Sequence, residues 1–416
     1  MSEEKNKKIL LIVVAVITLL ISAVIFIIIN PTNSPAVTET REKILPFGKP
    51  TPIDDTIIIN PNNDDSTHND TSSQNTQKLT HITPEPVAGA RFITNENEKT
   101  IVRYVKQKTG DIYKYSLEDE TSERVLQQTL LGIHSALWSK DGNSTILRFL
   151  KTEEIGNDTI KTYLLALEDN DGVSSTTSSV GKFLPDNLQE VIMSPSNSEK
   201  VIYLQKNNGG SFIMSENIVK DEERQQLFAS SLNDWLVEWP KEDLILITTK
   251  PSYNIDGYSY FVDPETGEMK KVLGEIKGLT TLISPDTTKI LYAKSERNLF
   301  DLVIYNVETK TETSLELNTL PEKCVWGGEN SNLLYCAVSN FSDNTNLPDD
   351  WYKGKISFSD ELWLINTETG KSGILTPTKG FSGEGIDIIE ISLSPNNDYL
   401  LFKNKKDGSL WMLKLE

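Results

Sequence analysis

The sequence predicts an all-β protein, a seven-bladed β-propeller, from a unit that repeats after residue 90. In each unit a hydrophobic strand ends in Trp or in Ser-Pro, a polar turn follows, and a second hydrophobic strand begins. The residues that end the first strand of successive units are 45, 55, 46, 44, 43 and 67 positions apart, namely Ile93, Trp138, Met193, Trp239, Ile283, Trp326 and Leu393. Strand-rich repeats of about 40–50 residues are typical of β-propellers.

A second recurring turn supports the same fold. It lies between the third and fourth strands of several units and reads Asp-Pro-Glu-Thr-Gly at 263–267, Asn-Val-Glu-Thr-Lys at 306–310 and Asn-Thr-Glu-Thr-Gly at 366–370. Asp or Asn opens such a turn with a side-chain hydrogen bond to the backbone, and Gly supplies a positive φ. Because the first unit is assigned by alignment and the sixth is stretched, six or eight blades are the alternatives to seven.

Residues 9–29 predict a transmembrane helix. The stretch holds 21 nearly uninterrupted apolar positions, of which only Thr18 and Ser22 are polar. A helix rising about 1.5 Å per residue would span roughly 31 Å, enough to cross a hydrocarbon core of about 30 Å. Three lysines within residues 1–8 favour a cytoplasmic N-terminus, so we expect a single-pass cell-membrane protein with an extracytoplasmic body. A cleaved signal peptide is the alternative, although its apolar region usually has only about 7–15 residues.

Residues 30–76 predict a flexible linker. Asn, Ser, Thr, Pro and Asp dominate the segment. Such a composition cannot bury enough apolar surface to offset the conformational entropy that ordering would remove. We therefore expect a mobile tether between the membrane segment and the propeller.

The charge of the chain restricts its partners. There are 60 acidic and 41 basic side chains, which give a formal net charge of −19 at pH 7. Phosphate binding needs clustered Lys and Arg, and the sequence shows no basic stripe. We therefore expect no nucleic acid partner.

Residues 77–416 form the predicted propeller domain, and its last unit explains how the ring closes. That unit ends one strand short of four, after the strands at 386–393, 399–403 and 409–415. Residues 77–82 precede the first inner strand and have the character of an outermost strand. We expect them to complete the last blade, because closure by one N-terminal and three C-terminal strands removes exposed sheet edges.

Three local features carry a family resemblance: the Trp-Ser-x-Asp-Gly turn at 138–142, the Ser-Pro-Asp turn at 284–286 and the Tyr-Asn-Val-x-Thr stretch at 305–309. With them, the chain resembles TolB-type, WD-repeat-like β-propeller repeats over roughly residues 77–416. As a whole it resembles single-pass membrane-anchored propeller proteins of bacteria. The resemblance implies the fold and leaves the function open, since such repeats occur in scaffolds, receptors and accessory domains of enzymes.

The sequence predicts no catalytic residue, no metal site and no cofactor. Propeller peptidases carry a separate α/β-hydrolase domain with a Gly-x-Ser-x-Gly motif, whereas the nearest string here is Gly-Phe-Ser-Gly at 380–383. Only three histidines occur, His68, His81 and His134. This number argues against a Ser-His-Asp triad and against a histidine metal site.

Cys324 and Cys336 predict a structural disulfide. They lie on the first and second strands of the sixth unit, and a hairpin register in which residue numbers sum to 660 sets them opposite each other. The same register pairs Val325 with Tyr335 and Trp326 with Leu334. Directly opposed cysteines can be bridged, and an exported domain favours the disulfide over two free thiols.

The long connection at 340–355 in the sixth unit is the candidate binding surface. It accounts for the spacing of 67 residues and contains Asp349, Asp350, Trp351 and Tyr352. Long loops on a rigid scaffold often carry binding residues. The alternative is that Trp351 and Tyr352 pack the loop onto its own blade.

Two functional hypotheses follow from the sequence. The first is a non-catalytic, membrane-anchored platform for protein or peptide partners near the membrane surface, favoured because no nucleophile, metal or cofactor motif is present. The second is a carboxylate-dependent enzyme acting on glycans or similar polymers, which would place two carboxylates about 5–10 Å apart in a channel. The linear sequence does not show which carboxylates converge.

Overall fold

The computed structural model describes residues 78–94, 99–126, 130–152, 158–168, 178–196, 198–218, 224–296, 299–328, 332–339, 346–378 and 385–415. The predicted cytoplasmic N-terminus (1–8), transmembrane helix (9–29) and linker (30–76) lie outside these residues. In the part of the chain that is described, no helix is long and apolar enough to cross a membrane.

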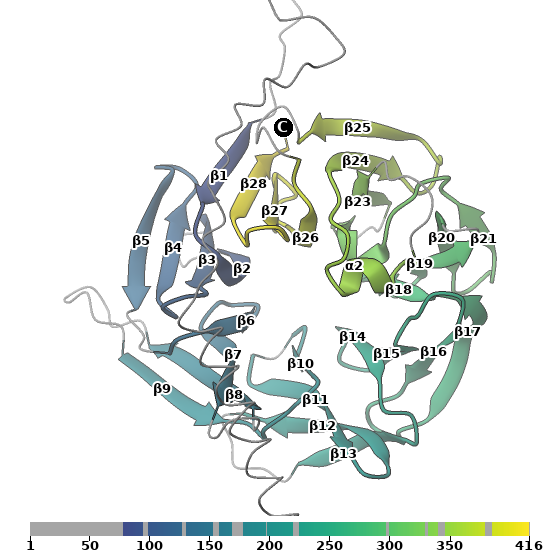
Figure 1. The fold of residues 1–416 in the computed structure, drawn as a ribbon, viewed down its shortest axis with the longest axis horizontal. Coiled ribbons are helices and arrows are strands. Elements are labelled where there is room, and N and C mark those ends of the chain that lie inside the picture. The colour runs from purple at the N-terminus through teal and green to yellow at the C-terminus, as the bar shows by residue number, and fades with distance from the viewer. Residues whose placement is uncertain are drawn as a thin grey trace, which may run out of the picture. The chain divides into compact units, whose positions relative to one another are not determined.

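Seven four-stranded antiparallel sheets surround a central opening, which confirms the predicted seven-bladed propeller (Figure 1). Strands are given from the innermost outward. Blade 1 consists of β2 (Val87–Thr94), β3 (Thr100–Lys106), β4 (Ile112–Ser116) and β5 (Thr121–Leu126), and blade 2 of β6 (Ile133–Trp138), β7 (Ser144–Thr152), β8 (Asp158–Glu168) and β9 (Ser178–Phe183). Blade 3 consists of β10 (Glu190–Met193), β11 (Lys200–Asn207), β12 (Gly210–Asn217) and β13 (Gln225–Ser230).

Blades 4 to 7 follow the same order around the ring. Blade 4 consists of β14 (Trp235–Lys241), β15 (Leu244–Thr249), β16 (Asp256–Val262) and β17 (Met269–Lys277), and blade 5 of β18 (Thr280–Ile283), β19 (Lys289–Glu296), β20 (Leu299–Asn306) and β21 (Glu312–Ser314). Blade 6 consists of β22 (Cys324–Gly327), β23 (Leu333–Ser339), β24 (Asp360–Asn366) and β25 (Ser372–Pro377). Blade 7 consists of β26 (Ile388–Leu393), β27 (Tyr399–Asn404), β28 (Leu410–Lys414) and β1 (Leu79–Thr83). Two short helical elements, η1 (Pro321–Lys323) and α2 (Asp349–Tyr352), belong to blade 6 connections.

The ring closes as the sequence predicts. Strand β1 pairs with β28 and becomes the outermost strand of the last blade, with Leu79 opposite Leu413. The ring of His81 stacks on Trp411, with ring centroids 4.0 Å apart. One N-terminal strand and three C-terminal strands therefore complete blade 7.

The two ends of the blades differ, and we name them by their connections. The turn face carries the turns between first and second strands and between third and fourth strands. The loop face carries the connections between second and third strands and the links from one blade to the next. On the turn face, Ser284 Oγ accepts a hydrogen bond from Lys289 N at 3.0 Å and donates one to Asp286.

The core lies mainly between neighbouring blades. Trp138, at the end of β6, packs with Ala88, Val105 and Ile112 of blade 1. Trp239 and Trp326 occupy corresponding positions between blades 3 and 4 and between blades 5 and 6. Each of these tryptophans is buried. Burial of such large aromatic side chains holds adjacent blades together.

Candidate functional site

The connection between β23 and β24 is the most distinctive part of the loop face. Its residues 346–359 are described, whereas 340–345 lie outside the described residues. Within it, α2 stands beside the central opening (Figure 1). We call residues 346–358 the blade 6 insertion.

Asp349 and Leu347 extend the blade 6 insertion to two earlier blades. The Asp349 carboxylate accepts hydrogen bonds from Tyr253 N at 2.6 Å and from Ser252 Oγ at 3.3 Å, in the connection between β15 and β16 of blade 4. The Leu347 carbonyl accepts a hydrogen bond of 2.9 Å from Ser295 Oγ at the end of β19 in blade 5. The insertion therefore crosses blade 5 and reaches blade 4.

Trp351 fastens the blade 6 insertion to blade 7. Its side chain is only 5% exposed, and its indole Nε1 donates to both carboxylate oxygens of Asp387, at 3.2 and 3.1 Å. Its ring stacks on Phe358 at a centroid distance of 5.9 Å. Trp351 thus packs the insertion against Phe358 and joins it to Asp387 of blade 7.

A fully buried lysine lies beneath Trp351. The side chain of Lys323 is 0% exposed, and its Nζ lies 2.7 Å from both Asp360 Oδ2 and Asp387 Oδ1. The same Nζ donates to the Ile388 carbonyl at 2.9 Å. Lys323 therefore links η1, the start of β24 and the residue before β26, so it holds together blades 6 and 7 and the base of the insertion.

The buried cluster contains two carboxyls for one ammonium. Asp387 Oδ2 also accepts a hydrogen bond of 3.0 Å from Phe358 N, so both of its oxygens are satisfied. Asp360 Oδ1 is buried and has no hydrogen-bond partner. Burial raises the pKa of Asp360, and the pairing with Lys323 only partly opposes this shift.

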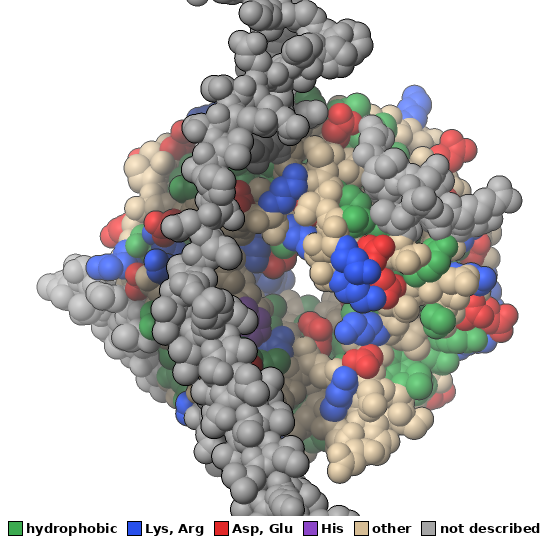
Figure 2. Space-filling model, viewed as in Figure 1, with side chains coloured by type: hydrophobic (Ala, Val, Ile, Leu, Met, Phe, Trp, Pro, Cys, Tyr) green, Lys and Arg blue, Asp and Glu red, His purple; other side chains and the backbone are tan. Residues whose placement is uncertain are grey.

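The outer side of the insertion is polar and partly exposed. Lys405 Nζ lies 3.8 Å from the centroid of the Trp351 ring, a cation–π contact. Asp350 forms an ion pair of 2.9 Å with the exposed Lys355. Tyr352 is 39% exposed, and its hydroxyl donates a hydrogen bond to Glu322. In Figure 2, lysine and acidic side chains gather beside the central opening, where α2 lies in Figure 1.

Of the four predicted binding residues, only Tyr352 is substantially exposed, and its hydroxyl is bound to Glu322. Asp349 and Asp350 are occupied by backbone amides and by lysines of the same insertion. Sequence reasoning missed Lys323 and Asp387, because no local pattern brings together residues 64 positions apart. A lysine directly before a hydrophobic strand gave no sign of its burial.

Another carboxyl with a perturbed pKa, that of Glu238, lies on the innermost strand of blade 4. Glu238 accepts hydrogen bonds of 2.8 Å from Thr281 Oγ1 and 2.8 Å from Ile283 N, both on β18 of blade 5. Burial raises the pKa of Glu238 to about 7, and the charge of nearby Glu322 adds to the shift. Glu238 therefore joins the inner walls of two adjacent blades.

The predicted disulfide is present. Cys324 and Cys336 are bonded, and β22 pairs with β23 in the predicted register, with Val325 opposite Tyr335 and Trp326 opposite Leu334. Both cysteines are buried. The bond lies directly after Lys323, at the base of the insertion.

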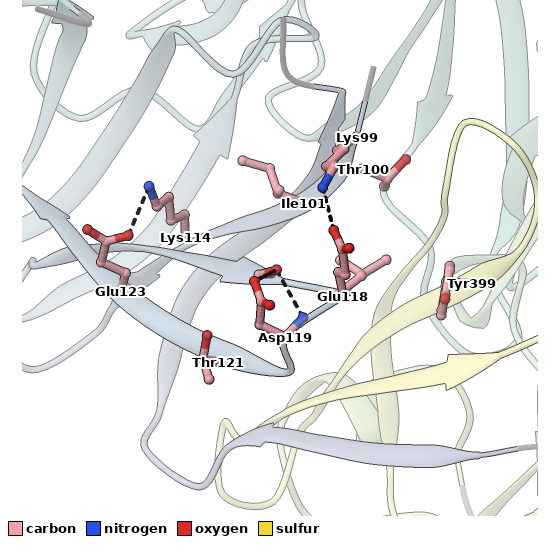
Figure 3. Close-up of a pocket in the computed structure, with 11 residues that line it drawn as sticks. Lys99, Thr100, Ile101, Lys114, Glu118, Asp119, Thr121, Glu123 and Tyr399 are labelled. Atoms are coloured by element: carbon pink, nitrogen blue, oxygen red, sulfur yellow. Dashed lines mark hydrogen bonds and ion pairs between the residues drawn. The ribbon is translucent and has the colours of Figure 1, made fainter. Parts of the chain in front are cut away.

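A cleft of about 520 Å³ lies at the turn-face end of blade 1, next to Tyr399 of blade 7 (Figure 3). Its charged side chains pair with each other, Lys114 with Glu123 at 2.9 Å and Lys99 with Glu118. The cleft therefore offers a ligand few uncommitted charges. Across the described residues, no group of three or more His, Cys, Asp or Glu side chains could hold a metal ion.

Together the fold and the site define a closed seven-bladed β-propeller with one enlarged connection fixed across its loop face. Among solved structures, the β-propeller domain of Cps50 (Swd1) from Myceliophteria thermophila is similar to this chain, with a TM-score of 0.51, 12% identity and coverage of 82% of this chain and 100% of that chain. An oligogalacturonate lyase in complex with manganese has a TM-score of 0.50 and 10% identity, and the match covers 83% of this chain and 94% of that chain. TolB from Acinetobacter baumannii has a TM-score of 0.40 and 12% identity, and the match covers 79% of each chain.

At these identities the likeness shows the fold alone. The resemblance to WD-repeat-like propellers is thereby confirmed for the architecture. No family model matches the chain, and the search of curated proteins also finds no match.

Proposed function

We propose that this protein is a membrane-anchored, extracytoplasmic β-propeller whose loop face binds protein or peptide partners without catalysing a reaction. The observation that carries the proposal is the fixation of the blade 6 insertion. One short segment contacts blade 4 through Asp349, blade 5 through Leu347 and blade 7 through Trp351. Binding residues are commonly presented on loops that a rigid scaffold positions.

Apolar exposure on the loop face supports the same proposal. Leu131 is 70% exposed, Leu232 52% and Ile255 61%, and each lies on a loop-face connection of a different blade or link. Tyr352 adds a fourth exposed side chain on the insertion. Exposed apolar side chains on one face can contribute to contact with another protein, and Tyr is enriched at interface hot spots.

The proposed anchor would limit where partners are met. With residues 9–29 in the membrane, a linker of about 46 residues has a mean reach of roughly 35–40 Å. Tethering at this range raises the effective concentration of membrane-proximal partners, so weak contacts suffice. The net charge of −19 favours partners with basic surfaces.

The competing hypothesis, a carboxylate-dependent enzyme acting on glycans, receives less support from the geometry. Such an enzyme needs an acid and a second carboxylate that both reach the sugar. Both oxygens of Glu238 accept hydrogen bonds from β18, so this carboxyl serves the contact between blades. The similar oligogalacturonate lyase shares the fold and gives no residue-level support.

Photocrosslinking on intact cells tests the binding proposal. A photoreactive amino acid replaces Tyr352 or Lys353 on the loop face of the full chain, and the matched control replaces Glu308 on the turn face. We expect the two loop-face positions to capture the same partner and the turn-face position to capture none. Equal capture from both faces, or capture from neither, contradicts the proposal.

Protease treatment and linker deletion test the anchoring. We expect external protease to digest the propeller on intact cells, and the chain to remain with the membrane after an alkaline carbonate wash. Deletion of residues 50–75 should weaken partner capture while leaving the propeller folded, because the shortened linker restricts its reach. A chain without residues 9–29 that captures partners equally well on the cell surface would refute the tethered arrangement.

A further inference from the structure

Two neighbouring carboxyls near the insertion have no cation paired with them. Glu322 lies on η1, which packs beside β18, the strand to which Glu238 is hydrogen-bonded. The charge of Glu322 acts on Glu238, so the two groups are close enough to repel each other. Among the described residues, neither carboxylate forms an ion pair within 4.0 Å.

One oxygen of Glu322 is left without any partner. Its Oε1 accepts the hydrogen bond from the Tyr352 hydroxyl, whereas its Oε2 is shielded from solvent and accepts none. Burial raises the pKa of Glu322, because the charged form loses hydration that this environment does not replace. A buried acceptor without a donor is rare in native proteins and marks a place where a donor can be gained.

The cations nearby are committed elsewhere. Lys323, the next residue in the chain, directs its ammonium to Asp360 and Asp387. Lys353 is paired with Asp349 at 3.0 Å, and Lys355 with Asp350 at 2.9 Å. Among the described residues, Glu322 Oε2 therefore has no donor, and it is available to a cation that comes from outside the propeller.

We propose that Glu322, supported by the charge of Glu238, binds the ammonium or guanidinium group of a lysine or arginine side chain, with Tyr352 as the cover that this cation displaces. This inference rests on the proposed function, because it names the chemistry of the partner that the loop face receives: a basic peptide segment. Tyr352 is suited to the task, since the residue is partly exposed and an aromatic ring can contact a cation through its face.

The donor set favours a single organic cation over a divalent metal. Calcium takes about six to eight oxygen ligands, commonly from several carboxylates. This site offers two carboxylates, and both oxygens of Glu238 already accept hydrogen bonds from Thr281 and Ile283. A guanidinium needs only one or two acceptors at its end, which Glu322 provides.

Fluorine NMR on the full chain in lipid nanodiscs tests this inference. The chain carries 3-fluorotyrosine, and the Tyr352 resonance is assigned through Tyr352→Phe. The probes are n-butylguanidinium and n-butylurea, its neutral isostere. We expect a saturable shift of the Tyr352 resonance with n-butylguanidinium and none with n-butylurea. An equal response to both probes overturns the inference.

Matched variants locate the binding group. Glu322→Gln should weaken the n-butylguanidinium response by about tenfold or more, because the charge-assisted hydrogen bond is lost. Glu308→Gln, on the turn face, should leave it unchanged. Retention of the response in a folded Glu322→Gln chain refutes the site, and so does a saturable shift with calcium chloride that competes with the guanidinium probe.

The outcome is separable from the fate of the proposed function. Loop-face photocrosslinking that persists in Glu322→Gln, with no response to n-butylguanidinium in the parent chain, would refute the cation site and leave the binding platform intact. A guanidinium response without any captured partner would support the site and contradict the platform.

Discussion

The turn face and the loop face of this propeller connect strands of the same sheets by opposite means. On the turn face one hydrogen-bonding arrangement recurs in three blades. The side-chain hydroxyls of Ser139, Ser284 and Ser394 each accept a hydrogen bond of 2.9–3.0 Å from the backbone amide of the first residue of the next strand. On the loop face, the blade 6 insertion depends instead on a buried ion cluster, because Lys323 with its two aspartates lies at its base.

The difference separates scaffold from specialisation. A repeated turn satisfies its own polar groups within a few residues, so it can recur in every blade at little cost. A buried ion cluster needs partners from distant parts of the chain and is costly to desolvate. Two aspartates illustrate the difference: backbone amides lower the pKa of Asp263 on the turn face, whereas burial raises the pKa of Asp360 at the base of the blade 6 insertion.

The largest expected effect comes from removing the buried ammonium. Lys323→Met leaves Asp360 and Asp387 buried without a counter-charge, and breaking such a pair destabilises a fold by about 3–5 kcal/mol. We expect the free energy of unfolding, measured by urea denaturation, to fall by this amount. Lys371→Met, on an exposed turn-face lysine of the same blade, should change it by less than about 0.5 kcal/mol.

A triple variant sharpens this first prediction. Lys323→Met combined with Asp360→Asn and Asp387→Asn removes all three charges, so much of the lost stability should return. If Lys323→Met alone costs less than about 1 kcal/mol, the cluster does not hold the insertion as described.

The pH dependence of stability gives the second effect. The pKa of Glu238 is raised from its ordinary 4.5 to about 7 in the folded protein. A group with a raised folded pKa contributes stability that is complete below pH 4.5 and is lost as the pH rises through about 7, by up to roughly 3 kcal/mol. Urea denaturation at pH 4.5 and pH 8 should show this loss in the parent chain.

The control for this effect is Glu238→Gln, which should remove the contribution of residue 238 to the pH dependence of the free energy of unfolding between pH 4.5 and pH 8. Asp263 on the turn face has a lowered pKa and acts with the opposite sign, since its contribution is lost only as the pH falls below its ordinary 3.8. An identical pH profile for the parent chain and Glu238→Gln would contradict the assignment.

Removal of the disulfide should have a smaller effect. The bond closes a loop of 12 residues, and the entropy of closing such a loop corresponds to about 2–3 kcal/mol. A Cys324→Ala, Cys336→Ala chain should unfold at lower urea concentration, with its strand content by circular dichroism unchanged. Thiol labelling that finds two free cysteines in protein from an oxidising compartment would show that the bond does not form there.

The smallest effect should be the same in three blades. Ser139→Ala, Ser284→Ala and Ser394→Ala each remove one side-chain acceptor from the same turn geometry, which costs about 1 kcal/mol per site. Equal losses in the free energy of unfolding would support the view of the turn face as a repeated scaffold. Losses that differ by more than about twofold between blades would contradict it.

The sequence predicted the features that are encoded locally. The anchors that end each inner strand, the closing strand at 77–82 and the register that sets Cys324 opposite Cys336 all depend on neighbours within one strand or hairpin. Alternation and turn chemistry act at this range, and they recur in each blade.

The candidate site depends on contacts that the sequence does not encode locally. Lys323 reaches Asp387 across 64 positions, and Asp349 reaches Tyr253 across 96. An aspartate or lysine at the end of a strand is usually exposed, so residue type gives no sign of burial. The sequence allows Trp351 to be either a binding residue or a residue that packs the loop. Only the hydrogen bond from its indole to Asp387 shows why its side chain is buried.

The closing strand has a mechanical consequence. In the proposed anchored state, the linker joins the propeller at β1, the one strand of blade 7 that is not continuous with the other three. Any tension between membrane and partner therefore falls first on the pairing of β1 with β28, beginning at Leu79 and Leu413. The stack of His81 on Trp411 lies two residues further along. The strand that closes the ring is thus also the one that takes up this tension, and a strong pull would separate β1 from β28 before it disturbed the other six blades.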